Sequence, residues 1–228
     1  MSGFKVKACG NTRAEDVKTA DEAGADFVGV VAEVDSSPRS VGAKQAREIL
    51  GAAKKAQRAL LLLNPPRDRL RELVDTILPD VVHLVGEEDP QMLEDLKTYF
   101  SGKIFKSIHL PPAGEEEPPL DKAIRLIKKY ADTGADAVVV DTRDASRGMF
   151  GGTGKVSDWK AAAEITASSP LPVFLAGGIS IDNVEEALRD VCPYGVDLAS
   201  GLECEVGKKD AEIVRAFIKK VHNYTSGR

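Results

Sequence analysis

The sequence has few cysteines, no long apolar run and no excess of positive charge. Its three cysteines, Cys9, Cys192 and Cys204, are an odd number without CxxC spacing, which argues against a disulfide framework or a structural zinc site and favours a reducing cytoplasm. No stretch approaches the roughly 20 apolar residues that a membrane span requires, and the first residues lack a signal-peptide core. The formal net charge of -5 argues against a broad surface for nucleic acid or anionic membranes.

Short apolar runs rich in β-forming residues alternate with helical stretches along the chain. Runs such as Ala59–Leu63 and Ala137–Val140 lack the polar alternation of a half-exposed strand, so they are typical of parallel strands buried on both faces. The expected strands are Phe4–Ala8, Phe27–Val31, Ala59–Leu63, Val81–Leu84, Ile104–Ile108, Ala137–Val140, Val173–Ala176 and Gly195–Leu198. The expected helices are Ala14–Ala23, Ala43–Ala56, Arg67–Leu78, Pro90–Phe100, Leu120–Thr133, Asp158–Ala167, Ile181–Val191 and Asp210–Val221.

This α/β alternation over 228 residues predicts a single (β/α)8 TIM barrel domain over residues 1–228. A doubly wound open sheet is the competing architecture, because hydrophobicity does not reveal closure. An internal echo relates Glu22–Val28 to Asp132–Val138; each segment has a glycine, Gly24 or Gly134, where a helix should end in a left-handed cap. The echo reflects either shared loop chemistry or duplicated half-barrels.

In such barrels the reactive groups lie at the carboxyl ends of the strands. Cys9 follows the first expected strand, where a thiol of lowered pKa acts as a base or nucleophile; the alternative is a small buried residue that caps the barrel. Asp141 follows the sixth strand, where a buried carboxylate is costly unless it is hydrogen-bonded or used; it could instead cap a loop. Asp197, at the end of the eighth strand, would either bind substrate or order the rim.

Two glycine-bearing loops after the last two strands predict a phosphate site. Gly177 and Gly178 follow the seventh strand, and Ser200 and Gly201 follow the eighth. Backbone N–H groups of these loops commonly converge on a phosphate in this fold, although such glycines also occur in simple tight turns. The glycine-dense loop Arg147–Lys155 lacks the P-loop arrangement, and we expect a lid over a ligand or a surface loop there.

Several motifs occur together in an order that is specific for one enzyme family. They are Lys7–Thr12, Ser37–Ser40, Asp141–Thr142, Gly151–Lys155, Ala176–Ile179 and Val196–Glu203. In type and order they resemble phosphoribosylanthranilate isomerase of tryptophan biosynthesis, over essentially the whole chain. The resemblance implies an Amadori rearrangement of N-(5-phosphoribosyl)anthranilate to 1-(2-carboxyphenylamino)-1-deoxyribulose 5-phosphate. It further implies a phosphorylated small-molecule substrate and a reaction without metal or organic cofactor; monomer and homodimer both remain open.

The resemblance also implies roles for individual residues. Asp141 would be the general acid that protonates the furanose ring oxygen, and Cys9 the general base that removes the C2′ proton. Arg39 would bind the anthranilate carboxylate, a task suited to a planar bidentate donor. The phosphate would lie at the two glycine-bearing loops, with Asp197 as a further substrate-binding residue.

The sequence departs from the family pattern after the fourth expected strand. Where the family commonly has Gln-Leu-His-Gly-Glu-Glu, this chain has His83-Leu84-Val85-Gly86-Glu87-Glu88. Because side chains alternate along a strand, His83 and Val85 should face the same way, and His83 is either a partial replacement for the missing histidine or a core residue. Lys106 within the fifth strand leaves a Schiff-base aldolase open. Another sugar-phosphate isomerase and a non-catalytic phospholigand-binding protein are further alternatives.

Overall fold

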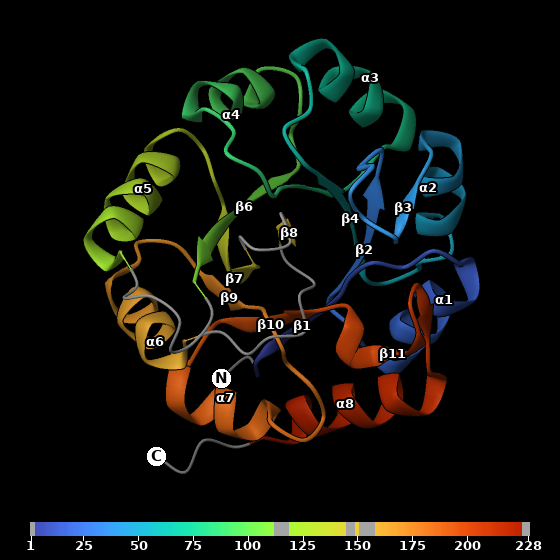
Figure 1. The fold of residues 1–228 in the computed structure, drawn as a ribbon. Coiled ribbons are helices and arrows are strands. Elements are labelled where there is room, and N and C mark those ends of the chain that lie inside the picture. Colours follow the sequence, from blue (N-terminus) through green and yellow to red (C-terminus); the bar gives the residue numbers. More distant parts are fainter. Residues whose placement is uncertain (1–2, 112–118, 145–148, 151–157, 225–228) are drawn as a thin grey trace.

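Eight parallel strands form a closed barrel in the computed structural model, which describes residues 3–111, 119–144, 149–150 and 158–224. The barrel strands are β1 (Lys5–Ala8), β2 (Phe27–Ala32), β4 (Gln57–Leu62), β5 (Val81–Leu84), β6 (Lys103–Leu110), β7 (Ala137–Asp144), β9 (Val173–Leu175) and β10 (Gly195–Leu198). They are hydrogen-bonded in the order β1-β10-β9-β7-β6-β5-β4-β2, and the pairing of β1 with β2 closes the sheet (Figure 1). The predicted barrel is therefore confirmed over the open sheet.

A ring of helices surrounds the barrel (Figure 1). The helices are α1 (Ala14–Ala23), α2 (Ala43–Leu50), α3 (Arg67–Ile77), α4 (Pro90–Lys97), α5 (Leu120–Asp132), α6 (Trp159–Ser168), α7 (Val184–Val191) and α8 (Ala211–Asn223). Most begin and end within about three residues of the expected bounds. Helix α2 is the exception: it ends at Leu50, before Gly51, because the following backbone N–H groups of Lys55 and Ala56 instead donate to the Asp21 carboxylate.

Two features of the loops bear on the site. The glycines of the internal echo, Gly24 and Gly134, have φ of 98° and 105°, so the left-handed conformation expected after α1 and α5 is confirmed. The structure also contains short elements that hydrophobic periodicity did not predict. These are β3 (Ser40–Val41), β8 (Met149–Phe150), the 3-10 helix η2 (Ser200–Leu202), β11 (Glu203–Glu205) and β12 (Lys208–Lys209).

The barrel interior is filled by a small apolar cluster. It consists of Phe27, Ala59, Val81, Phe105, Ala137, Val139, Phe174 and Ala176. The rings of Phe27, Phe105 and Phe174 lie with centroids 5.2–5.6 Å apart. Because side chains alternate along a strand, residues two positions after these inward-facing side chains, such as Ser107 after Phe105, also face the interior, nearer the carboxyl ends of the strands.

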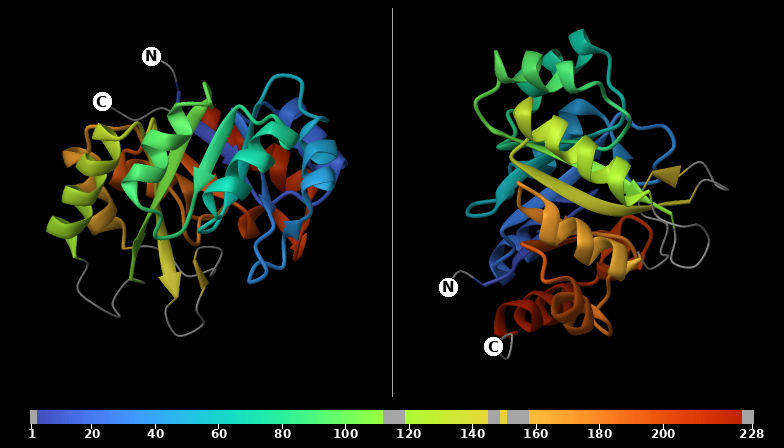
Figure 2. Two further views of the ribbon diagram at one scale, coloured as in Figure 1. Left: turned by 90° about the horizontal axis from the view of Figure 1, so that it is seen from above. Right: turned by 90° about the vertical axis from the view of Figure 1, so that its left-hand side faces the viewer.

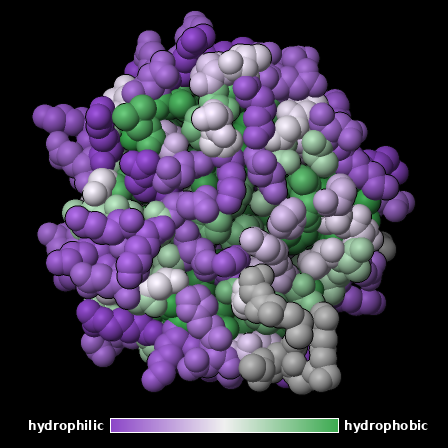
Figure 3. Space-filling model, turned by 180° about the vertical axis from the view of Figure 1, so that it is seen from behind, coloured by the Kyte–Doolittle hydropathy of each residue, from purple (hydrophilic) through white to green (hydrophobic). Residues whose placement is uncertain are grey.

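The carboxyl ends of the strands lie on one face, opposite the described chain ends. In Figure 2 the strand arrows end on the side away from the labels N and C. The opposite face is mostly hydrophilic, with hydrophobic residues interspersed near its centre (Figure 3). No helix in the described part of the chain is long and apolar enough to cross a membrane.

Candidate active site

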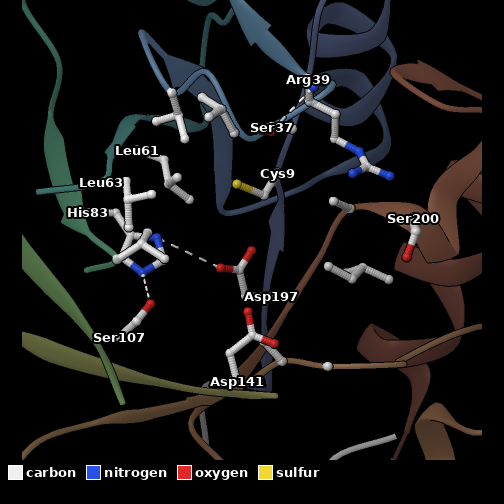
Figure 4. Close-up of a pocket in the computed structure, with 18 of the residues that line it drawn as sticks. Cys9, Ser37, Arg39, Leu61, Leu63, His83, Ser107, Asp141, Asp197 and Ser200 are labelled. Atoms are coloured by element: carbon white, nitrogen blue, oxygen red, sulfur yellow. Dashed lines mark hydrogen bonds and ion pairs between the residues drawn. The ribbon is translucent and has the colours of Figure 1, made fainter. Parts of the chain in front are cut away.

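A pocket opens at the carboxyl ends of the barrel strands and collects most of the residues singled out from the sequence. Seven of them line it: Cys9, Arg39, Asp141, Gly177, Gly178, Asp197 and Ser200. Figure 4 shows Cys9, His83, Asp141 and Asp197 around one space, although Cys9 follows β1 and the other three come from β5, β7 and β10. Gly201 lies one residue beyond the lining. Barrel closure therefore brings together groups that are nearly 200 positions apart in the sequence.

Cys9 and Asp141 are held at this pocket by backbone hydrogen bonds. The backbone N–H of Cys9 donates to Leu198 O at 2.9 Å, and burial raises the pKa of the Cys9 thiol, although the nearby Lys7 ammonium opposes this shift. Burial also raises the pKa of the Asp141 carboxyl to about 7, with the charge of Asp197 adding to the effect. A carboxyl group with a pKa near neutrality is suited to donate a proton at physiological pH.

A chain of buried polar groups crosses the pocket floor. Lys7 Nζ donates to Asp197 Oδ2 at 2.7 Å, and both side chains are almost inaccessible. His83 Nδ1 lies 4.0 Å from the same Asp197 oxygen, while His83 Nε2 is hydrogen-bonded to Ser107 Oγ at 2.9 Å. Desolvation lowers the pKa of His83 well below its ordinary value, with the Lys7 charge contributing, so the ring is neutral. Lys7 and Ser107 were not singled out as site residues from the sequence.

Arg39 lies in the pocket wall and is anchored by a carboxylate. Its Nε and Nη2 each donate to Glu203 at 2.7 Å, and Lys209 Nζ donates to the same carboxylate at 3.0 Å. This bidentate geometry fixes the guanidinium plane. Arg39 Nη1 forms no hydrogen bond within the described residues, so it remains able to bind a ligand. Glu203 ends a motif quoted above, but pairing with Arg39 across 164 positions had no signal in the sequence.

The two glycine-bearing loops touch one another at the pocket. Gly177 and Gly178 have φ of 85° and 67°, which only glycine adopts readily. A Cβ atom on Gly201 would lie 2.1 Å from Ile179 O, so the two loops are in direct backbone contact. Their backbone N–H groups at Gly177, Gly178 and Gly201 donate to no described residue, which leaves them available for an anion.

Lys106 does not reach the pocket. It faces away from the barrel interior, because its neighbour Ser107 faces inward. Its ammonium pairs with the fully buried Glu88 at 3.0 Å and donates to Gly86 O at 2.7 Å. A Schiff base with a ligand in the pocket would require this buried pair to break, so the structure contradicts the aldolase alternative.

His83 and Val85 both line the pocket, which confirms that they face the same way. Among the described residues, no group of three or more metal-ligating side chains is found. The expected lid Arg147–Lys155 lies outside the described residues except for the backbone of β8.

A (β/α)8 barrel with a thiol, a carboxyl group of raised pKa and two touching glycine-bearing loops at one mouth is an arrangement typical of enzymes that act on phosphorylated small molecules. The chain matches the family model for N-(5'phosphoribosyl)anthranilate (PRA) isomerase over residues 6–220, and it belongs to this family. It is 38% identical over 219 residues to N-(5'-phosphoribosyl)anthranilate isomerase of Methanocella arvoryzae, covering 95% of this chain and 97% of that protein.

Solved structures agree with this family. The phosphoribosyl anthranilate isomerase of Thermus thermophilus is 30% identical, with a TM-score of 0.77, and the match covers 95% of this chain and 98% of that one. A second structure, of a phosphoribosyl anthranilate isomerase in complex with reduced 1-(o-carboxyphenylamino)-1-deoxyribulose 5-phosphate, has a TM-score of 0.77 at 23% identity, covering 97% and 100% of the two chains. At that identity it supports the fold.

Proposed function

We propose that this chain isomerises N-(5-phosphoribosyl)anthranilate to 1-(2-carboxyphenylamino)-1-deoxyribulose 5-phosphate, with Asp141 as general acid and Cys9 as general base. The observation that carries the proposal is that both groups line one pocket, from β7 and the end of β1. Their different environments suit different roles, because Asp141 retains its proton to near-neutral pH whereas Cys9 has the Lys7 cation beside it.

The reaction begins with proton transfer from Asp141 to the furanose ring oxygen. As the C1–O bond breaks, the anilino nitrogen supplies its electron pair and a Schiff base forms. The Cys9 thiolate then removes the proton from C2, and the electron pair of that C–H bond moves to give an enolamine, which tautomerises to the ketone. Burial opposes the thiolate form of Cys9, so the Lys7 ammonium stabilises the charge that develops there.

Substrate binding uses the rest of the pocket wall. Arg39, held flat by Glu203, offers Nη1 to the anthranilate carboxylate. The phosphate binds at the backbone N–H groups of Gly177, Gly178, Ser200 and Gly201. These two anchors place the sugar between the acid and the base, which lowers the entropic cost of reaching the transition state.

The test is a steady-state fluorescence assay with phosphoribosylanthranilate generated in situ, applied to Cys9→Ala and Asp141→Asn. Each variant should lose at least ~10²-fold in kcat, the amount typical of removing a general acid or base, while its circular dichroism spectrum stays unchanged. His222→Gln is the control, because His222 lies at the end of α8 and does not line the pocket. Near-normal turnover in either site variant would refute the role given to that residue.

We further expect the protein to act in the cytoplasm as a monomer or homodimer, with no nucleic-acid or membrane partner. Sedimentation of the purified protein with and without substrate analogue would distinguish the two oligomeric states. Complementation of a tryptophan auxotroph that lacks this step would test the activity in a cell.

A further inference from the structure

Two buried polar atoms face the pocket without a hydrogen-bond partner among the described residues. They are His83 Nδ1 and Asp197 Oδ1. Both residues line the pocket (Figure 4), and they are only 2% and 6% exposed. A buried polar atom without a partner costs on the order of 1–3 kcal/mol, so a pair of them at one site indicates a ligand group that satisfies both.

Each of the two side chains is held from its other end. Ser107 Oγ lies 2.9 Å from His83 Nε2, and Lys7 Nζ donates to Asp197 Oδ2 at 2.7 Å. Lys7 occupies only Oδ2 of Asp197, and the second oxygen, Oδ1, is a hydrogen-bond acceptor that has no partner among the described residues. Neither side chain can turn away from the pocket without breaking a buried hydrogen bond. The site is thus formed before a ligand arrives.

The charges around His83 determine which of its nitrogens carries the proton. Its ring is neutral, because burial and the Lys7 and Lys106 cations lower its pKa. A proton on Nδ1 points toward the Asp197 carboxylate, 4.0 Å away, and leaves Nε2 to accept from the Ser107 hydroxyl. This tautomer is favoured over its alternative, which would turn a nitrogen lone pair toward a carboxylate.

We propose that His83 and Asp197 together bind one hydroxyl group of the sugar, which accepts a hydrogen bond from His83 Nδ1–H and donates one to the Asp197 carboxylate. A hydroxyl group is both donor and acceptor, so it matches this pair of atoms. His83 Nδ1 lies 4.0 Å from Oδ2 of this carboxylate, so the ring and the carboxylate are close enough for one ligand oxygen, about 2.8 Å from each group, to contact both. His83 is therefore a residue that sets specificity for a hydroxylated sugar. The inference rests on the proposed function for its ligand.

The test measures the coupling between one side chain and one ligand hydroxyl. Reduced 1-(o-carboxyphenylamino)-1-deoxyribulose 5-phosphate and its three analogues that lack the C2, C3 or C4 hydroxyl are titrated by calorimetry into wild type, His83→Phe and His83→Asn. In wild type, one analogue should bind roughly 10- to 100-fold more weakly than the parent, as expected for hydrogen bonds that involve a charged group. In His83→Phe that penalty should shrink severalfold, whereas His83→Asn, whose amide keeps a donor near Nδ1, should retain most of it.

Equal penalties in wild type and His83→Phe for all three analogues would overturn the inference and leave the isomerase proposal intact. Absence of both turnover and binding in wild type would overturn both. His222→Gln is the matched control, because it removes a histidine outside the pocket.

A measurement on the wild-type protein covers the case in which His83→Phe does not fold. The chain has only three histidines, so nitrogen-15 spectra of histidine-labelled protein resolve each ring. The inference expects His83 to be the Nδ1–H tautomer and its Nδ1 resonance to shift on adding the parent ligand, while His222 does not shift. An Nε2–H tautomer, or a His83 signal that the ligand leaves unchanged, would overturn it.

Discussion

The raised pKa of Asp141 predicts that replacing this carboxyl group by an amide stabilises the protein at alkaline pH relative to acidic pH. Burial raises the pKa of the Asp141 carboxyl from its unperturbed value of 3.8, which applies to the unfolded chain, to about 7 in the folded protein. Between these values the native state holds a proton that the unfolded state has lost. The free energy of unfolding therefore decreases as pH rises through this window, and the contribution of Asp141 is fully lost above about pH 7.

The size of this effect follows from the pKa difference. Each unit of pKa difference is worth about 1.4 kcal/mol, so Asp141 should lower the unfolding free energy of wild type by up to roughly 3 kcal/mol between pH 5 and pH 8. Because Asp141 is partly exposed, solvent screening reduces the penalty, and we expect about 1–3 kcal/mol. Asn preserves the oxygen that accepts from the Thr142 backbone N–H at 2.7 Å. Asp141→Asn should therefore lose this pH dependence without losing that hydrogen bond.

The assay is urea unfolding of wild type and Asp141→Asn at several pH values between 5 and 8. As pH rises, the unfolding free energy of wild type should fall relative to that of Asp141→Asn. Asp80→Asn is the matched control, because the ion pair with Arg58 lowers the pKa of Asp80, so this carboxyl is ionised in both states above pH 5. Its substitution should cost the same at each pH. A pH-independent difference for Asp141→Asn would refute the idea that the folded protein retains the Asp141 proton.

Two further substitutions test the contacts around the pocket. Glu203→Gln leaves the buried Arg39 and Lys209 cations without their carboxylate and should lower the unfolding free energy by roughly 3–5 kcal/mol; a loss below about 1 kcal/mol in urea unfolding would contradict this. Gly201→Ala places a Cβ 2.1 Å from Ile179 O, so the two loops must separate. We expect this substitution to lower the unfolding free energy by about 1–3 kcal/mol and to raise the inhibition constant of inorganic phosphate. An unchanged inhibition constant would argue against phosphate binding at this contact.

The barrel was predictable from the sequence because buried parallel strands are continuous apolar runs, and seven of the eight site residues named from loops and motifs do line one pocket. The predicted end of α2 was wrong because a distant side chain binds the backbone there: α2 ends at Leu50, and the backbone N–H of Ala56 donates to the Asp21 carboxylate. Pairings such as Lys7 with Asp197, 190 positions apart, had no local signal. They depend on barrel closure, which brings β1 beside β10.

Lys7 acts unequally on the thiol and the two carboxyl groups of the pocket. Its ammonium donates to Asp197 Oδ2 at 2.7 Å and lies beside Cys9, where it opposes the rise in the pKa of the thiol that burial causes. Asp141 has no ion-pair partner within the described residues, and its main stabilising contact is a backbone N–H, so burial keeps it protonated. The buried cation on β1 therefore lies against Cys9 and Asp197, whereas burial raises the pKa of the Asp141 carboxyl to about 7, which is the asymmetry that the proposed roles of Asp141 and Cys9 require.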